Sequence, residues 1–133
     1  MIRKITLGIS LFISTLMFAS PAYADWEVAG ENEYSTYYVD FDRMRTNGGY
    51  VYYWQLSDYL EPNKYGTLSI KTYTQGDCDM FRYKALSWSS YEQPMGEGLG
   101  DIESTPDTEW IYPSPNSVAE EMLKRVCEYA ENL

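Results

Sequence analysis

The sequence predicts an α+β domain in which an antiparallel sheet carries a C-terminal helix on one face, tied to the sheet by a disulfide. Three observations lead to this prediction. Aromatic and β-branched residues alternate with polar ones in stretches separated by short turn signals, at a spacing of about ten residues. After Pro113 the apolar residues recur at helical spacing instead. The chain has two cysteines, and one falls in each part: Cys78 and Cys127.

The strands are expected in succession along the first two thirds of the chain. Residues 26–41 contain two short strands, and the Asn47-Gly48 pair that follows is a strong turn signal. Further strands are expected over residues 50–59, 65–74 and 78–91, with Pro62 and the sequence Gln75-Gly76-Asp77 as breaks. Strands at this spacing with short turns are typical of an antiparallel meander.

The segment over residues 92–109 interrupts this rhythm. It holds three glycines, two prolines and six acidic residues, with no basic residue. The composition predicts a long acidic loop, which is either ordered for a function or mobile and solvated. Its glycine-rich part lacks the lysine and the following helix of a phosphate-binding loop. A last short strand is expected at Trp110-Ile111-Tyr112, before Pro113.

The C-terminal segment has the signals of an amphipathic helix. Either Ser114-Pro115 opens it, or Ser117 and Glu120 form a capping box one turn later. Its apolar residues fall on one stripe, which includes Cys127: Val118, Ala119, Met122, Leu123, Val126, Cys127 and Ala130. A cysteine on the buried stripe of the helix is placed to reach a strand.

The first 24 residues have the pattern of a secretory signal peptide. Arg3 and Lys4 precede an apolar run over residues 5–18, and Ala22-Tyr23-Ala24 is a cleavage signal. The alternative, an uncleaved anchor, is disfavoured because the apolar run is short for a bilayer. Cleavage after Ala24 leaves one domain, residues 25–133, and no later segment is apolar enough to cross a membrane. An exported protein with two cysteines is expected to join them, so we predict a Cys78–Cys127 disulfide.

Charge and composition exclude several classes of function. Removing the 24 leader residues from the 133 takes two of the ten basic residues and none of the 20 acidic ones, which leaves a net charge of −12. Such a charge repels nucleic acid. The chain has no histidine, and both thiols are expected in the disulfide, so no imidazole or thiolate chemistry is predicted. The pairs Asp40/Asp42 and Asp77/Asp79 fall short of a calcium site. We therefore expect no catalytic residues, metal or cofactor.

The densest strand candidate, residues 50–59, is also the candidate binding surface. Tyr52, Trp54 and Leu56 share one face of it, and Val51, Tyr53 and Gln55 share the other. A helix on the sheet covers only one face, so aromatic side chains remain for recognition on the other. Which face is free depends on where the helix docks. The residues expected to form the binding face are Tyr50, Tyr52, Tyr53 and Trp54.

The order of these residues resembles the surface-adhesin protein E-like family of small bacterial envelope proteins. The pattern starts at Trp26, and its most specific part is Asp77-Cys78, then Trp110, Pro113 and a helix carrying Cys127. The resemblance covers nearly all of the chain after residue 24. It implies an antiparallel sheet of about six strands with the helix held on the concave face by the disulfide. It also implies adhesion to host matrix or serum proteins, with a homodimer as one form of assembly.

Two functions follow as expectations, and a third ranks below them. The first is a non-catalytic envelope binding module that acts as an adhesin. The second is a periplasmic structural or accessory protein that binds another envelope protein, which the lack of a lipid-anchor cysteine at the cleavage site favours. The third is a carboxylate-based hydrolase. The protein is accordingly expected to be exported, either periplasmic or at the cell surface, without a lipid anchor.

Overall fold

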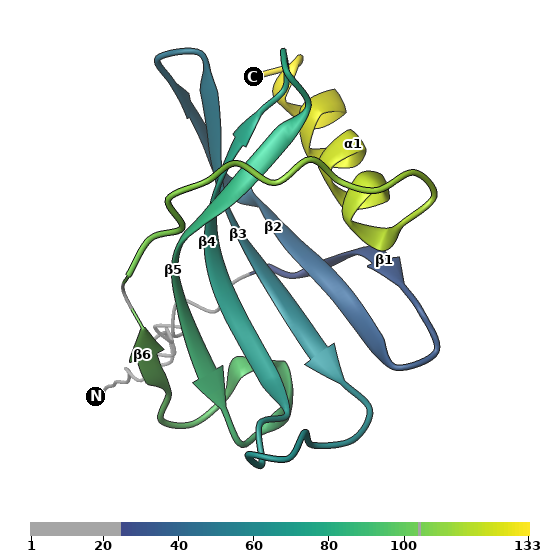
Figure 1. Cartoon of the computed structure of the whole chain (residues 1–133), viewed down its shortest axis with the longest axis vertical. Coiled ribbons are helices and arrows are strands. Elements are labelled where there is room, and N and C mark those ends of the chain that lie inside the picture. Colours follow the sequence, from purple (N-terminus) through teal and green to yellow (C-terminus); the bar gives the residue numbers. More distant parts are fainter. Residues whose placement is uncertain (1–24, 104) are drawn as a thin grey trace, which may run out of the picture.

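The structure, a computed structural model, describes residues 25–103 and 105–133 (Figure 1). The predicted signal peptide at residues 1–24 lies outside these residues. The elements are, in chain order, β1 (Glu27–Glu31), β2 (Ser35–Asn47), β3 (Tyr50–Tyr59), β4 (Ser69–Asp77), β5 (Arg82–Tyr91), the 3-10 turn η2 (Pro94–Gly96), β6 (Asp101–Glu103) and α1 (Val118–Ala130). None of the helices in these two ranges has the length and apolarity needed to span a membrane.

The strands form one antiparallel sheet in which each strand pairs with its neighbours in sequence, in the order β1 to β6. The predicted six-strand meander is therefore confirmed. Its sixth strand differs from the prediction, because it lies at Asp101–Glu103 instead of at residues 110–112. Ile111 makes a single bridge to Tyr83 on the same edge strand, β5. The two segments thus share one sheet edge, one at each end of β5.

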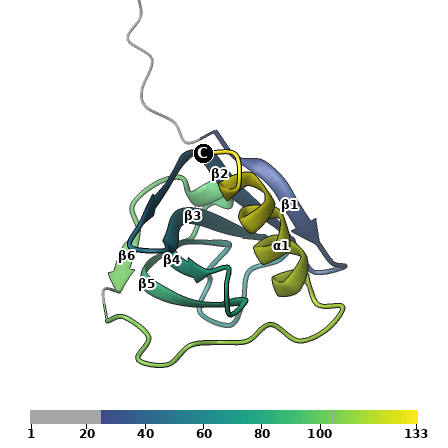
Figure 2. The same cartoon turned by 90° about the horizontal axis from the view of Figure 1, so that it is seen from above.

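Helix α1 lies on the concave side of the curved sheet, close to β1 and β2 (Figure 2). The Cys78–Cys127 disulfide joins the helix to the turn between β4 and β5, as predicted. On the opposite side of the helix, Arg125 donates a hydrogen bond of 2.9 Å to the backbone carbonyl of Val28 in β1. The helix is therefore fixed to both halves of the sheet.

The hydrophobic core fills the space between the sheet and the helix. Its buried side chains come from β1, β2, β3 and α1: Ala29, Val39, Phe41, Met44, Val51, Tyr53, Met122 and Val126. The pairing of β2 with β3 is interrupted between Asp40 and Arg45, where β2 bulges. The bulge lets both Phe41 and Met44 reach the core and returns the following residue, Arg45, to the other side of the sheet.

The turn between β4 and β5 lies three residues later than predicted. Gln75, Gly76 and Asp77 belong to β4, and the chain reverses at residues 78–81, where Phe81 takes a φ of 53°. Cys78 is consequently in the turn and not at the start of a strand. Gly76 serves close packing here: a Cβ built on it would lie 3.3 Å from the Tyr53 ring and 3.4 Å from Leu123.

Helix α1 begins with the second of the two predicted caps. Ser117 is the N-cap, and its hydroxyl accepts a hydrogen bond of 3.1 Å from the backbone N–H of Glu120. The Glu120 carboxylate in turn accepts from the backbone N–H of Asn116, at 2.9 Å. In the usual capping box this donor is the N–H of the N-cap residue, which here would be Ser117, so the bond is displaced by one residue. Glu120 and Glu121 lie in the first helical turn, where negative charge is favourable.

Replacing Ser117 by Ala is expected to lower the free energy of unfolding by about 1 kcal/mol, because the first helical turn loses its cap. Urea denaturation followed by circular dichroism measures this loss. Ser114→Ala is the matched control, since only the backbone carbonyl of Ser114 takes part in the cap, as the acceptor for the Ser117 hydroxyl. Equal stability of the two variants would contradict the assignment of the cap.

Candidate binding face

The register of the strands divides the sheet into two faces. Residues directly opposite each other in an antiparallel pair project to the same side. The inner face carries Val51, Tyr53 and Gln55 of β3, and helix α1 covers part of it. Tyr53 is 2% exposed, and burial raises the pKa of its hydroxyl, with a smaller contribution from Tyr83. Tyr53 is thus a core residue, and the candidate binding surface is corrected to the other three: Tyr50, Tyr52 and Trp54.

The outer face, opposite the helix, presents a cluster of aromatic side chains from β3 and β4. Tyr73 lies between two β3 residues: its ring centroid is 6.3 Å from that of Tyr52 and 4.9 Å from that of Trp54. Gln75 donates a hydrogen bond of 3.2 Å to the Tyr52 hydroxyl. All of these side chains are half-buried, so each ring is held in place and still accessible. Rigid rings with polar tips are typical anchors of binding surfaces.

Basic side chains contact aromatic groups of the outer face, both within this cluster and outside it. Arg45 donates a hydrogen bond of 2.8 Å to the Tyr73 hydroxyl. The Lys84 ammonium lies 4.6 Å from the centroid of the Trp110 ring, and the Lys71 ammonium lies 5.0 Å from that of Tyr91. These are cation–π distances, so the rings hold the positive charges at defined positions.

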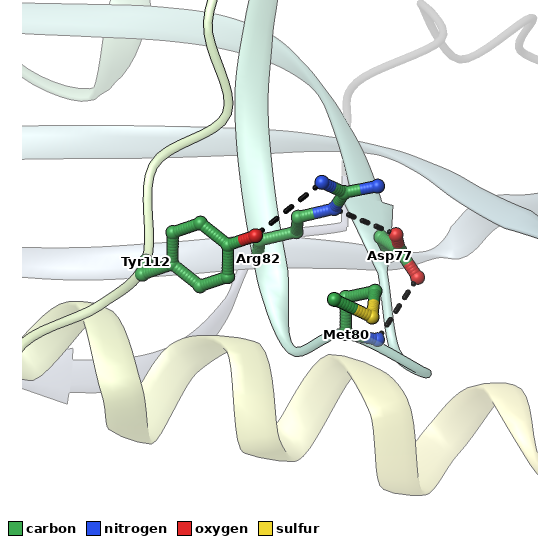
Figure 3. A network of polar contacts seen from close by, with 4 residues as sticks. All are labelled: Asp77, Met80, Arg82 and Tyr112. Atoms are coloured by element: carbon green, nitrogen blue, oxygen red, sulfur yellow. Dashed lines mark hydrogen bonds and ion pairs between the residues drawn. The ribbon is translucent and has the colours of Figure 1, made fainter.

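Trp110, from the segment between β6 and α1, adds a further ring to the outer face. Its ring stacks on Tyr50 with centroids 5.5 Å apart, and the Arg82 guanidinium lies 4.4 Å from its centroid. Arg82 also reaches between two other groups, as Figure 3 shows: its Nε donates to Asp77 at 2.8 Å, and its Nη1 donates to the Tyr112 hydroxyl at 3.4 Å. Arg82 therefore attaches the segment that carries Trp110 and Tyr112 to the end of the β4–β5 hairpin.

The Asp77 carboxylate is the fixed point of this network. Its Oδ1 accepts from the backbone N–H of Met80 at 3.2 Å, and its Oδ2 accepts from Arg82 (Figure 3). Burial opposes ionisation of Asp77, but the bonds from Arg82 and Met80 prevail and hold its pKa below the ordinary value of 3.8. The same carboxylate raises the pKa of Arg82.

Asp77→Asn is expected to make the folded protein less stable at pH 7. It should also make the stability change less as the pH is lowered. A carboxyl whose pKa is depressed by folding stabilises the folded state above its unfolded pKa, and this contribution disappears as pH falls through the folded pKa. The melting temperature of the variant should be a few degrees lower at pH 7, with a smaller difference from the wild type below pH 3.8. Asp79→Asn, in the same turn and exposed, is the control. A constant difference at all pH values would contradict this role.

Two hollows flank the aromatic cluster on the outer face. One, of about 480 Å³, is lined by Arg45, Thr46, Asn47, Tyr52 and Tyr73. The other, of about 270 Å³, is lined by Trp26, Asp40, Arg43, Trp54, Lys71, Ser89 and Tyr91. Asp40 is fully buried there, and its Oδ2 lies 3.4 Å from the Nε of Arg43. In the described ranges no group of three potential ligand residues is close enough to hold a metal ion.

The acidic segment after β5 is tied to the sheet at several points. Ser69 donates to the carbonyl of Gln93 at 2.6 Å and accepts from the N–H of Gly96 at 2.8 Å. Gly96 has a φ of 67°, and a Cβ at this position would lie 2.4 Å from the side chain of Lys71. Further along, Asp107 exchanges hydrogen bonds with the backbone of Ala85. The predicted acidic loop is therefore hydrogen-bonded to the sheet at Gln93, Gly96 and Asp107.

The sequence prediction selected strand β3 for the binding face, but it combined residues of both faces of that strand and missed the residues from other segments. Tyr73, Arg45 and Lys84 come from other strands, and only the register places them on the same face as Tyr52. Trp110 joins this face by stacking on Tyr50. The sequence held a signal only for the cations of β4 and β5, because Lys71, Arg82 and Lys84 all fall at outward positions. This signal could be used only if the position of the turn between β4 and β5 were known, because the turn sets their register.

The comparisons with known proteins agree with this architecture. The chain matches the family model described as surface-adhesin protein E over residues 26–128. Among solved structures, it is similar to crystal form II of Haemophilus influenzae protein E, with a TM-score of 0.62 and 14% sequence identity over 86% of this chain and 97% of that one. No curated protein sequence matches the chain. With nearly all of its sheet and helix inside the matched range, the chain belongs to the surface-adhesin protein E family.

Proposed function

We propose that the protein is a non-catalytic binding module of the bacterial envelope and that it binds its partner through the outer face. Membership of a surface-adhesin family supports the general role. The observation that carries the proposal is the accessible aromatic cluster of Tyr52, Trp54 and Tyr73, which lies on the side of the sheet opposite helix α1. An aromatic surface on the free side of a sheet favours association with a partner or with a second copy of the chain.

The partner in this proposal is a protein, of the host matrix or serum for an adhesin at the surface, or of the envelope for an accessory protein in the periplasm. Location separates these two roles. Protease treatment of intact cells should remove the protein if it acts as an adhesin. Protection from protease in intact cells, followed by digestion after the outer membrane is opened, would contradict the adhesin role and support the accessory role.

The double variant Tyr52→Ala and Trp54→Ala is expected to lose binding. Aromatic anchors at the centre of an interface typically contribute about 1–2 kcal/mol each, so the combined loss should exceed tenfold in Kd. The assay measures capture of the purified protein on a panel of matrix, serum and envelope proteins, and separately its dimerisation by sedimentation. Melting temperatures of both forms show whether the fold is intact.

The matched control changes the acidic segment and leaves the outer aromatic cluster unchanged. In this variant Glu92 and Glu97 become Gln, and both of them are exposed. It should alter the association rate and its salt dependence more than the affinity. If only this variant loses capture and dimerisation, the outer face is not the contact surface.

A further inference from the structure

The basic residues of the sheet lie on one face, although the chain as a whole is strongly acidic and the same outward positions also hold the carboxylates of Asp40, Asp58 and Asp77. Eight basic residues follow residue 24. Four of them occupy outward register positions in the paired strands: Arg45, Lys71, Arg82 and Lys84. No inward register position in the described strands holds a basic residue. Half of the positive charge after the leader is thus concentrated on the outer face.

Three of these four cations have no carboxylate partner within ion-pair distance in the described parts of the chain. Arg82 is paired with Asp77, whereas Arg45, Lys71 and Lys84 contact aromatic groups instead. The chain has 20 acidic residues that could have paired with them. These cations carry no neutralising carboxylate, and aromatic groups already hold their side chains in place. They can therefore bind an external anion with little further ordering of the side chains.

The arrangement of these groups follows the strands. Arg45, Tyr52, Gln75 and Lys84 form one row across β2, β3, β4 and β5, each directly opposite the next. Three strand spacings separate the ends of the row, so its two cations are about 14 Å apart at the backbone. Trp54 and Tyr73 form the adjacent row, and Lys71 with Leu56 forms the one after it. The cations therefore surround the aromatic cluster.

We propose that the outer face binds an acidic glycan, a chain of sugar units that carry carboxylate or sulfate groups. This glycan binding rests on the proposed function in one respect, namely that the outer face is the contact surface. Sugar rings present flat C–H surfaces that stack on aromatic side chains, and acidic groups on the same chain reach Arg45, Lys71 and Lys84. Hydroxyl groups find hydrogen-bonding partners in Gln75 and in the tyrosine hydroxyls.

The composition of the surface favours a sugar over an acidic peptide. In the central rows the aliphatic residue, Leu56, is fully buried, so the accessible groups are rings, amides, hydroxyls and cations. The rows lie on the face of the sheet, where the backbone groups of the central strands are already paired. A peptide cannot add a strand there. An acidic peptide would offer charge without flat surfaces for the rings.

Nuclear magnetic resonance titration tests this proposal with the tryptophan indole signals as reporters. Trp54 and Trp110 lie on the outer face, and Trp88 lies on the inner face opposite Thr72, so it is an internal control. The probes are a heparin hexasaccharide for sulfate, hexagalacturonate for carboxylate, maltohexaose as a neutral sugar and hexaglutamate as an acidic peptide. One or both acidic sugars should shift the signals of Trp54 and Trp110, leave Trp88 unchanged, and bind less tightly as salt increases.

Two double variants of equal charge test the role of the cations. Arg45→Glu with Lys84→Glu removes two cations from the outer face, and Lys64→Glu with Lys124→Glu removes two exposed cations elsewhere. The first should weaken binding of the acidic sugar roughly tenfold or more relative to the second, because the net charge is the same and only position differs. Lys84→Gln and Arg45→Gln, made singly, provide milder changes if the first double variant melts below the wild type.

Several results would overturn the inference. In the titrations these are no shift with any probe, shifts confined to Trp88, binding of maltohexaose as tight as that of the acidic sugars, or tighter binding of hexaglutamate than of the acidic sugars. In the variants it is an equal loss of acidic-sugar binding in the two double variants. Each of these outcomes leaves the proposed function open, because capture on proteins by the wild type and its loss in the Tyr52 and Trp54 double variant are measured separately.

Discussion

Replacing Cys127 by Ser is expected to lower the free energy of unfolding by about 4 kcal/mol and the melting temperature by about 15 °C. The disulfide joins residues 49 positions apart and connects helix α1 to the β4–β5 turn. Without it the unfolded chain gains freedom, and the helix keeps its core contacts and the Arg125–Val28 hydrogen bond. The sheet should therefore survive while the helix loosens, which hydrogen exchange measured along the helix would reveal.

Cys78→Ser is the control for this prediction. Both single variants and the double variant should lose the same stability, since all three remove one bond. Protein isolated from the cell envelope should show no free thiol by mass spectrometry. Two free thiols in that protein, or a melting temperature of Cys127→Ser equal to that of the wild type, would contradict the structural role of the bond.

Tyr53→Ala is expected to lower the free energy of unfolding by about 3–5 kcal/mol, the cost of removing a large buried aromatic side chain. Tyr53 lies against Gly76 and beside a cavity of about 190 Å³ under the helix, which the substitution would enlarge. Its neighbour Tyr52 points to the outer face, so Tyr52→Ala should cost only about 1 kcal/mol, from lost contact with Tyr73. Denaturant unfolding of the two variants compares the faces directly.

The contrast between these neighbours also separates stability from recognition. Tyr52→Ala should weaken binding with a nearly unchanged fold, and Tyr53→Phe, which keeps the ring, should have little effect on either. If Tyr52→Ala were the more destabilising of the two alanine variants, the assignment of inner and outer faces would be wrong.

The sequence predicted elements well where the local pattern and the tertiary role coincide. The strand Tyr50–Tyr59 has the bounds expected from its alternation, and the capping box over Ser117 is one of the two helix starts expected. Prediction failed where a residue serves a distant contact. Gly76 has the chemistry of a turn residue, but the structure uses its small size under Tyr53 and Leu123, and the turn falls at a positive-φ phenylalanine that no turn signal marks.

The binding face illustrates the same limit. Alternation along β3 separates Tyr52 and Trp54 from Tyr53, but both sets are aromatic, so the pattern contains no sign of which set the helix covers. That choice depends on the position of Cys78 in the β4–β5 turn and on the side to which the chain returns after Trp110. The cations and rings from other strands join the face only through cross-strand register, which depends on every turn in between.

The meander order of the strands also bears on how the protein folds. Because each strand pairs only with its sequence neighbours, the sheet is assembled from successive hairpins with short loop closures, which favours rapid formation. Docking of α1 is different in kind, since the contact between Arg125 and Val28 spans 97 positions. We expect the central hairpins of β2, β3 and β4 to be structured in the transition state and the helix to attach afterwards. During synthesis, the sheet can therefore take shape before the residues that complete the domain have left the ribosome or the export machinery.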